Sequence, residues 1–86
     1  MQREWVVSPD YRAAIDAIKA ARIAQKISQR ELARRLGKPP SFVNKIELLE
    51  RRLDILEFVQ ISQAIGIGPE KLMQTVLAAV TDKACG

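Results

Sequence analysis

Three polar side chains, Ser41, Asn44 and Lys45, share one face of a short amphipathic segment, PPSFVNKIELLERRLD, residues 39–54. The segment opens on two prolines and runs into the pair Arg51–Arg52, where a turn would be expected. Hydroxyl, amide and ammonium groups can donate hydrogen bonds, and the lysine and arginines also carry positive charge. The face therefore offers recognition chemistry, and the question is which partner it contacts.

Covalent catalysis and metal binding have little support in the composition. The chain has no histidine and one cysteine, Cys85, which excludes the common zinc sites, a Ser–His or Cys–His nucleophile and an internal disulfide. Acidic residues such as Asp16, Glu31 and Glu57 are explained by helix caps and exposed helix faces. We therefore expect neither an enzyme nor a cofactor or metal site. Cys85 is interpreted as a solvated thiol near the chain end rather than half of an intermolecular disulfide, which fits a reducing cytoplasm.

Length and composition favour one small helical domain. The 86 residues are 48% hydrophobic and 28% charged, as in globular proteins, and only 5% aromatic. The net charge of +4 permits a polyanionic partner without proving one. The opening MQREWVVSPD has no apolar run long enough for a signal peptide or membrane span, so we expect a cytoplasmic protein without membrane association.

Capping residues mark the starts of three predicted helices. Ser8 precedes the first, Ser28 and Glu31 form a capping box for the second, and Asp54 and Glu57 form another for the fourth. Prolines open the third and fifth helices, because proline fits the first turn of a helix but not its interior. The predicted helices span about residues 9–25, 29–36, 40–48, 55–65 and 69–80.

Apolar residues at helical spacing complete the predicted fold. In the fourth helix, for example, the stripe of Ile55, Phe58, Ile61 and Ile65 is expected to be buried. Five helices with short connections predict a compact all-α domain over residues 9–80, between an N-terminal arm, 1–8, and a C-terminal tail, 81–86. The second and third helices with their tight turn have the layout of a helix-turn-helix, which also occurs in domains that bind no nucleic acid.

The segment ISQRELARRLGKPPSFVNKIE, with Arg22 upstream and RRLDILEFVQISQAIGIGPEKL downstream, resembles a known family. It is similar to the lambda-repressor-like helix-turn-helix proteins of the Cro/repressor, xenobiotic-response-element (XRE) type. The resemblance covers roughly residues 15–72. It implies that the third helix lies in the major groove of double-stranded DNA.

The resemblance also assigns roles to individual residues. It implies that bases are contacted by Lys38, Pro40, Ser41, Asn44 and Lys45. It implies that the DNA backbone is contacted by Gln29, Arg30, Arg51 and Arg52. Arg22 and Glu47 match a structural ion pair. For each contact residue the alternative is ordinary solvated charge or polarity, and this alternative is stronger for Arg30, Arg34 and Arg35. Phe42 is expected in the core or an interface.

Two positions depart from the family pattern. Leu49 and Lys26 stand where glycine is common, and a residue other than glycine is disfavoured in a left-handed conformation. The sequence leaves two alternatives for Leu49: either it adopts a strained conformation, or the third helix continues by another turn.

One such domain reads only a few base pairs, so specific binding is expected from a homodimer on two half-sites. Dimer contacts are expected from the apolar residues of the fifth helix, Leu72, Met73, Val76, Leu77 and Val80, with a possible addition from Trp5, Val6 and Val7. The favoured function is a sequence-specific transcriptional regulator at the nucleoid. The alternative is a protein-interaction module, such as an antitoxin-like or adaptor protein, on the same fold.

Overall fold

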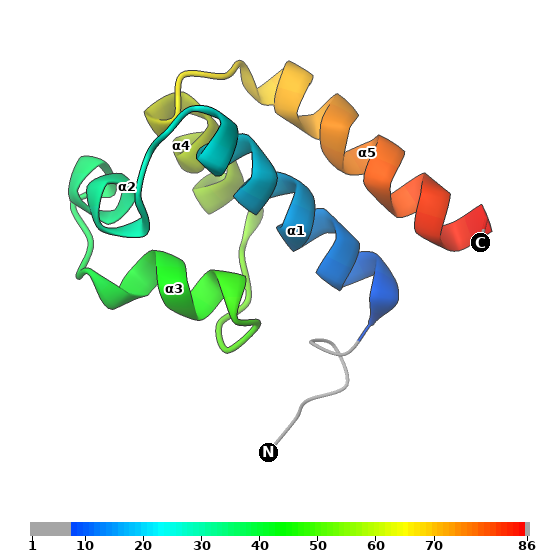
Figure 1. The fold of residues 1–86 in the computed structure, drawn as a ribbon, viewed down its shortest axis with the longest axis horizontal. Coiled ribbons are helices and arrows are strands. Elements are labelled where there is room, and N and C mark those ends of the chain that lie inside the picture. Colours follow the sequence, from blue (N-terminus) through cyan, green and yellow to red (C-terminus); the bar gives the residue numbers. More distant parts are fainter. Residues whose placement is uncertain (1–7, 86) are drawn as a thin grey trace.

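The predicted capping residues begin three of the helices in the computed structural model, which describes residues 8–85 (Figure 1). Helix α1 spans Pro9–Ala24, and the Ser8 hydroxyl accepts a hydrogen bond from the backbone N–H of Tyr11. Helix α2 spans Gln29–Leu36 behind Ser28, and α4 spans Ile55–Ala64 behind Asp54. Helix α3, Ser41–Glu47, directly follows Pro40, and helix α5, Pro69–Cys85, begins with a proline.

Two layers of packing hold the helices together. Helices α1 and α5 lie side by side along much of their length, while α2 packs against both α3 and α4 (Figure 1). The buried apolar side chains form one core that draws on all five helices, with members such as Ile15, Leu32, Val43, Ile61 and Leu72. No strand occurs within residues 8–85, so the part of the chain that the structure describes is all-α.

The end of α3 settles the alternative at Leu49. The helix ends at Glu47, and Leu49 has a φ of 64°, so of the two alternatives the strained conformation is present and the longer third helix is not. The backbone N–H groups of Glu50 and Arg51 both donate to the carbonyl of Lys45. This carbonyl in the last turn of α3 therefore has hydrogen-bond partners although the helix ends. Lys26 is also left-handed, with a φ of 61°. Each of these conformations costs roughly 1 kcal/mol relative to glycine.

The ends of the chain bear on the proposed domain boundaries. Helix α5 continues to Cys85, through most of the segment that the sequence predicts as a C-terminal tail. The possible interface residues Trp5, Val6 and Val7 lie outside the described residues. No helix in residues 8–85 is both long and apolar enough to cross a membrane.

Candidate nucleic-acid interface

Helix α3 has one buried side and one exposed polar side. Phe42, Val43 and Ile46 are buried in the core, whereas the other side of the helix presents Ser41, Asn44 and Lys45 to solvent. This division follows from the spacing of three and four residues that places side chains on one face of a helix. Within the described residues, the three exposed side chains form no hydrogen bond or ion pair. Their polar groups are therefore available to a partner.

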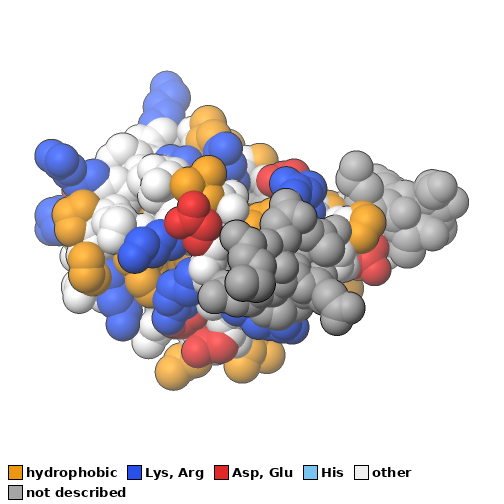
Figure 2. Space-filling view, turned by 90° about the horizontal axis from the view of Figure 1, so that it is seen from below, with side chains coloured by type: hydrophobic (Ala, Val, Ile, Leu, Met, Phe, Trp, Pro, Cys, Tyr) orange, Lys and Arg blue, Asp and Glu red, His pale blue; other side chains and the backbone are white. Residues whose placement is uncertain are grey.

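The turn before α3 extends this exposed surface. Lys38 and Pro40 are both exposed, and Pro40 directly precedes the first residue of the helix. The Lys38 ammonium lies 5.4 Å from the centre of the Phe42 ring, close enough for a cation–π contact. All five residues expected to contact bases thus lie on the surface of the turn and α3. Lysine and arginine side chains gather on the α2–α3 side of the face shown in Figure 2.

A buried network ties α3 to α1 and α2. Arg22 Nε donates to Glu47 Oε2 at 2.8 Å, and Arg22 Nη2 lies 3.1 Å from Glu47 Oε1. Arg22 Nη1 also donates to the carbonyl of Ile27 at 2.7 Å, and the Gln29 amide donates to Glu47 Oε1 at the same distance. The ion pair expected between Arg22 and Glu47 is therefore present. Its Glu47 carboxylate also holds the side chain of Gln29, the first residue of α2.

The two arginines after α3 have different surroundings. Arg51 is half-buried and donates to both carboxylate oxygens of Glu57, at 2.8 and 2.6 Å. Its guanidinium also lies 4.7 Å from the centre of the Phe42 ring. These hydrogen bonds lower the pKa of Glu57 below its usual value. Arg52 is exposed, and its guanidinium lies 5.7 Å from the centre of the Tyr11 ring.

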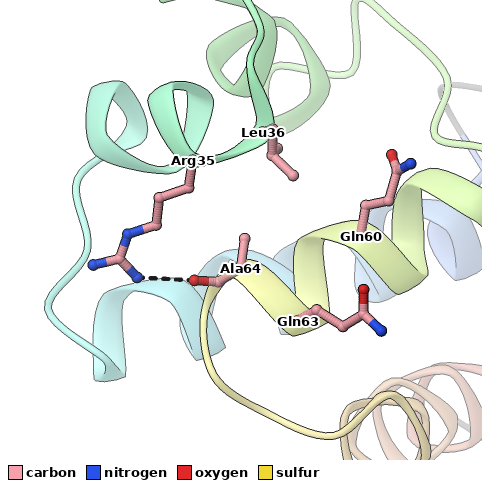
Figure 3. Close-up of a pocket in the computed structure, with 5 residues that line it drawn as sticks. All are labelled: Arg35, Leu36, Gln60, Gln63 and Ala64. Atoms are coloured by element: carbon pink, nitrogen blue, oxygen red, sulfur yellow. Dashed lines mark hydrogen bonds between the residues drawn. The ribbon is translucent and has the colours of Figure 1, made fainter.

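The arginines of α2 differ in a similar way. Arg34 and Arg35 both donate to the Glu31 carboxylate, and these hydrogen bonds lower the pKa of Glu31 from 4.5 to about 2. Arg35 also donates to the carbonyl of Ala64 at 2.8 Å, across a shallow pocket between α2 and the end of α4 (Figure 3). Arg30 is exposed to solvent. Arg34 and Arg35 thus have partners within the protein, whereas Arg30 faces outward.

The α5 residues expected at a dimer interface do not share one environment. Leu72 and Val76 are only 1% and 9% exposed because they belong to the core, so the assignment of Leu72 to an interface is wrong. Val76 keeps only a small exposed surface, at an apolar groove beside α5. Met73 and Val80 are half-buried, and only Leu77 is mainly exposed, at 56%. The exposed surface that α5 offers to an interface is therefore supplied mainly by Met73, Leu77 and Val80.

Sequence reasoning missed an apolar surface at the start of α4. Ile55, which was expected to be buried, is 79% exposed, and Leu56 is 62% exposed. Both residues lie in the first turn of α4, and their side chains lie outside the core. Ile55 borders an apolar groove, defined here by Tyr11, Ala14, Leu53, Ile55, Met73 and Val76. The capping box at Asp54 could have indicated this exposure, because it makes Ile55 the first residue of the helix.

No metal site accompanies these surfaces in the described part of the chain. Within it, no group of three histidine, cysteine, aspartate or glutamate residues is arranged to hold a metal ion. The arrangement instead offers hydrogen-bonding groups and positive charge on α3 and its flanking turns. Such a surface suits a long polyanion whose grooves carry hydrogen-bonding groups.

Comparisons with known proteins agree with this geometry. A family model described as "Helix-turn-helix" matches residues 18–72. A solved structure of an XRE-family like protein from Pseudomonas syringae pv. tomato str. DC3000 is similar, with a TM-score of 0.75 and 46% sequence identity. The match covers 80% of this chain and 84% of that chain. No curated protein matches the chain.

Proposed function

The chain belongs to the lambda-repressor-like, XRE-type helix-turn-helix family of DNA-binding regulators, and we propose that it regulates transcription as a homodimer that reads a specific DNA sequence. The observation that carries the proposal is the exposed face of α3, whose polar side chains have no partner within the described residues. Because the opposite side of the helix is buried, the helix can enter a groove without losing its packing. The protein would act at the nucleoid, in the cytoplasm.

The residues of α3 would read base edges in the major groove. Asn44 suits the N6 and N7 groups of adenine, and Lys45 suits the O6 and N7 groups of guanine. A bidentate pair of this kind is worth about 1–3 kcal/mol of discrimination against the wrong base. Ser41 lies on the same face, Pro40 can contact a thymine methyl group, and Lys38 lies close enough to reach bases or phosphates.

Flanking groups would hold the DNA backbone and set the register of α3. Gln29 lies at the N-terminus of α2, where free backbone N–H groups favour an anion, and Arg30 is exposed beside it. Arg52 is exposed in the loop on the other side of α3. Contacts to phosphate from both sides would fix the position of the reading helix without themselves selecting a sequence.

A second copy of the chain would pack against the apolar surface near α4 and α5. Leu77 follows Met73 by one helical turn, so it extends the α5 wall of the apolar groove. The protruding side chain of Ile55 borders the same groove, which gives this surface both a projection and a recess. A two-fold axis beside Ile55 would let each copy fill the recess of the other. Such a dimer would present two α3 helices to half-sites about 34 Å apart.

The dimer surface is tested by sedimentation of Leu77→Arg beside Gln74→Arg. Both residues are exposed on α5, and both variants gain the same charge. We expect Leu77→Arg to be monomeric and Gln74→Arg to be dimeric. A dimer that persists in Leu77→Arg would contradict this placement of the interface.

The function itself is tested by a salt titration of binding to DNA. Contacts to phosphate release counterions, so the logarithm of the affinity should fall with the logarithm of salt concentration by about 0.9 per contact. Arg52→Ala should bind every sequence more weakly, and the slope of log affinity against log salt concentration should be shallower by about 0.9, the value of one phosphate contact. Binding that does not depend on salt would instead favour the protein-interaction module.

A further inference from the structure

The backbones of α3 and α4 do not lie side by side. Helix α3 packs against α1 and α2, and within the described residues its backbone does not approach that of α4. The loop between α3 and α4 also turns through the left-handed residue Leu49, where glycine would be favoured. Direct contacts between these two helices are therefore made by side chains, and a side chain that joins them helps to set the orientation of α3.

Arg51 provides such a link. Its guanidinium lies over the ring of Phe42, a buried residue in the first turn of α3. The same guanidinium donates to both oxygens of Glu57 in the first turn of α4. Glu57 in turn accepts from the backbone N–H of Asp54 and completes the capping box of α4. A single side chain thus joins the reading helix to the start of α4.

These contacts compete with a contact to DNA. Arg51 Nη1 donates to Glu57 and to the carbonyl of Arg52, and Nη2 donates to the second Glu57 oxygen. The Glu57 side chain is only 12% exposed, so its carboxylate would lose its main partner if Arg51 turned to a phosphate. Arg52 is exposed at the surface of the loop, where its guanidinium lies over the ring of Tyr11.

We propose that Arg51 is a positioning residue, which sets the orientation of α3 through Phe42 and Glu57 and does not clamp a phosphate. This inference rests on the proposed function, because it assigns the selection of sequence partly to residues that do not touch DNA. Arg51 and Arg52, which the family resemblance treats alike, then have separate roles. Arg52 contributes general affinity, while Arg51 contributes the ability to distinguish sequences.

The test compares affinity for a selected site with affinity for random DNA in Glu57→Gln and Arg51→Lys. Glutamine at position 57 keeps the capping geometry but removes the charge, and lysine at position 51 keeps the charge but removes the planar fork. Glu50→Gln is the matched control, because Glu50 is an exposed carboxylate in the same loop. All proteins are compared at a temperature at which circular dichroism shows them folded, so lost stability alone does not change the ratio of affinities.

We expect both variants to lower the ratio of specific to random binding by about tenfold, the value of one misplaced base contact. The affinity for random DNA should stay within twofold of that of the Glu50→Gln control. The slope of log affinity against log salt concentration should match that of the control. If Arg51 clamps phosphate instead, Glu57→Gln would release it and strengthen binding to all sequences equally, with an unchanged ratio. That result, or an unchanged ratio in Arg51→Lys, would overturn the proposal.

A second measurement separates this inference from the proposed function. Residual dipolar couplings of the protein without DNA report the angle between α3 and α4. We expect Glu57→Gln to change that angle and Glu50→Gln to leave it as in the wild type. An unchanged angle in Glu57→Gln would refute the positioning role, whereas a changed angle without any sequence preference in the wild type would refute only the proposed function.

Discussion

Replacing Arg22 by methionine should destabilise the protein more than any change to an exposed charge. Arg22 and Glu47 have side chains only 9% and 7% exposed, so the pair is largely removed from water. Without Arg22, the Glu47 carboxylate keeps only the amide of Gln29, and the carbonyl of Ile27 loses its donor. Breaking one side of a buried ion pair costs about 3–5 kcal/mol.

That cost is large for a domain of this size. Small domains unfold with a total free energy of about 5–15 kcal/mol, so Arg22→Met should remove about a fifth or more of the stability. Urea denaturation followed by circular dichroism measures the loss directly. A double-mutant cycle with Glu47→Gln should show that the two single changes are not additive, because each removes the partner of the other.

The matched control for this experiment is Arg34→Met. Arg34 also forms an ion pair, with Glu31, but it is exposed on the surface of α2, and Arg35 still pairs with the same carboxylate when Arg34 is removed. We expect the control to unfold at nearly the same urea concentration as the wild type. The reasoning would be refuted if Arg22→Met were no less stable than Arg34→Met, or if the cycle showed no coupling between Arg22 and Glu47.

Three further predictions concern local structure. Lys26→Gly should stabilise the protein by up to about 1 kcal/mol in urea denaturation, because glycine tolerates the left-handed conformation, and Lys26→Ala should give no gain. Asp54→Ala should cost about 1 kcal/mol through loss of the N-cap of α4, again measured in urea. In an NMR titration the Glu31 carboxyl should have a pKa of about 2, and removing Arg34 and Arg35 should return it towards 4.5. Because the pKa of Glu31 is lowered in the folded state, its ion pairs with Arg34 and Arg35 contribute stability above pH 4.5, and that contribution is lost as the pH falls through about 2. A midpoint near 4.5 in the wild type would contradict the pairing seen in the structure.

Local signals predicted the helices well because their starts depend on nearby residues. Asp54 and Glu57 form the reciprocal capping box in the structure. At Ser28 only half of the predicted box forms, since the hydroxyl accepts from Glu31 while the Glu31 carboxylate binds Arg34 and Arg35. Arginines three and four residues along a helix compete with the cap for the same carboxylate, and capping motifs alone do not show which interaction prevails.

The sequence was less informative about which apolar residues remain exposed. Spacing placed Ile55 with the buried stripe of its helix, yet it is 79% exposed, in the first turn of α4. Leu72 was expected at an interface and is instead covered by the rest of the chain, and Val76 is only 9% exposed. Helical periodicity identifies a face, but the neighbours that cover it are set by packing between distant segments.

The candidate site shows the same limit. Sequence spacing placed Ser41, Asn44 and Lys45 on one face, and they are exposed together on α3. The sequence did not distinguish Arg51 from Arg52, because the difference comes from Phe42 and Glu57, which approach Arg51 only in the folded chain. The residues that a helix exposes can thus be predicted locally, whereas the partners of a loop residue cannot.

Selection of binding sites from a pool of random DNA tests the central claim that α3 reads bases. We expect the wild type to enrich a sequence with two-fold symmetry. Asn44→Ala should lose the preference for at least one base in each half-site, while Arg52→Ala should enrich the same sequence with weaker binding. If the wild type enriches no sequence, or if Asn44→Ala enriches the same sequence as the wild type, then Asn44 and its face of α3 do not read DNA as proposed.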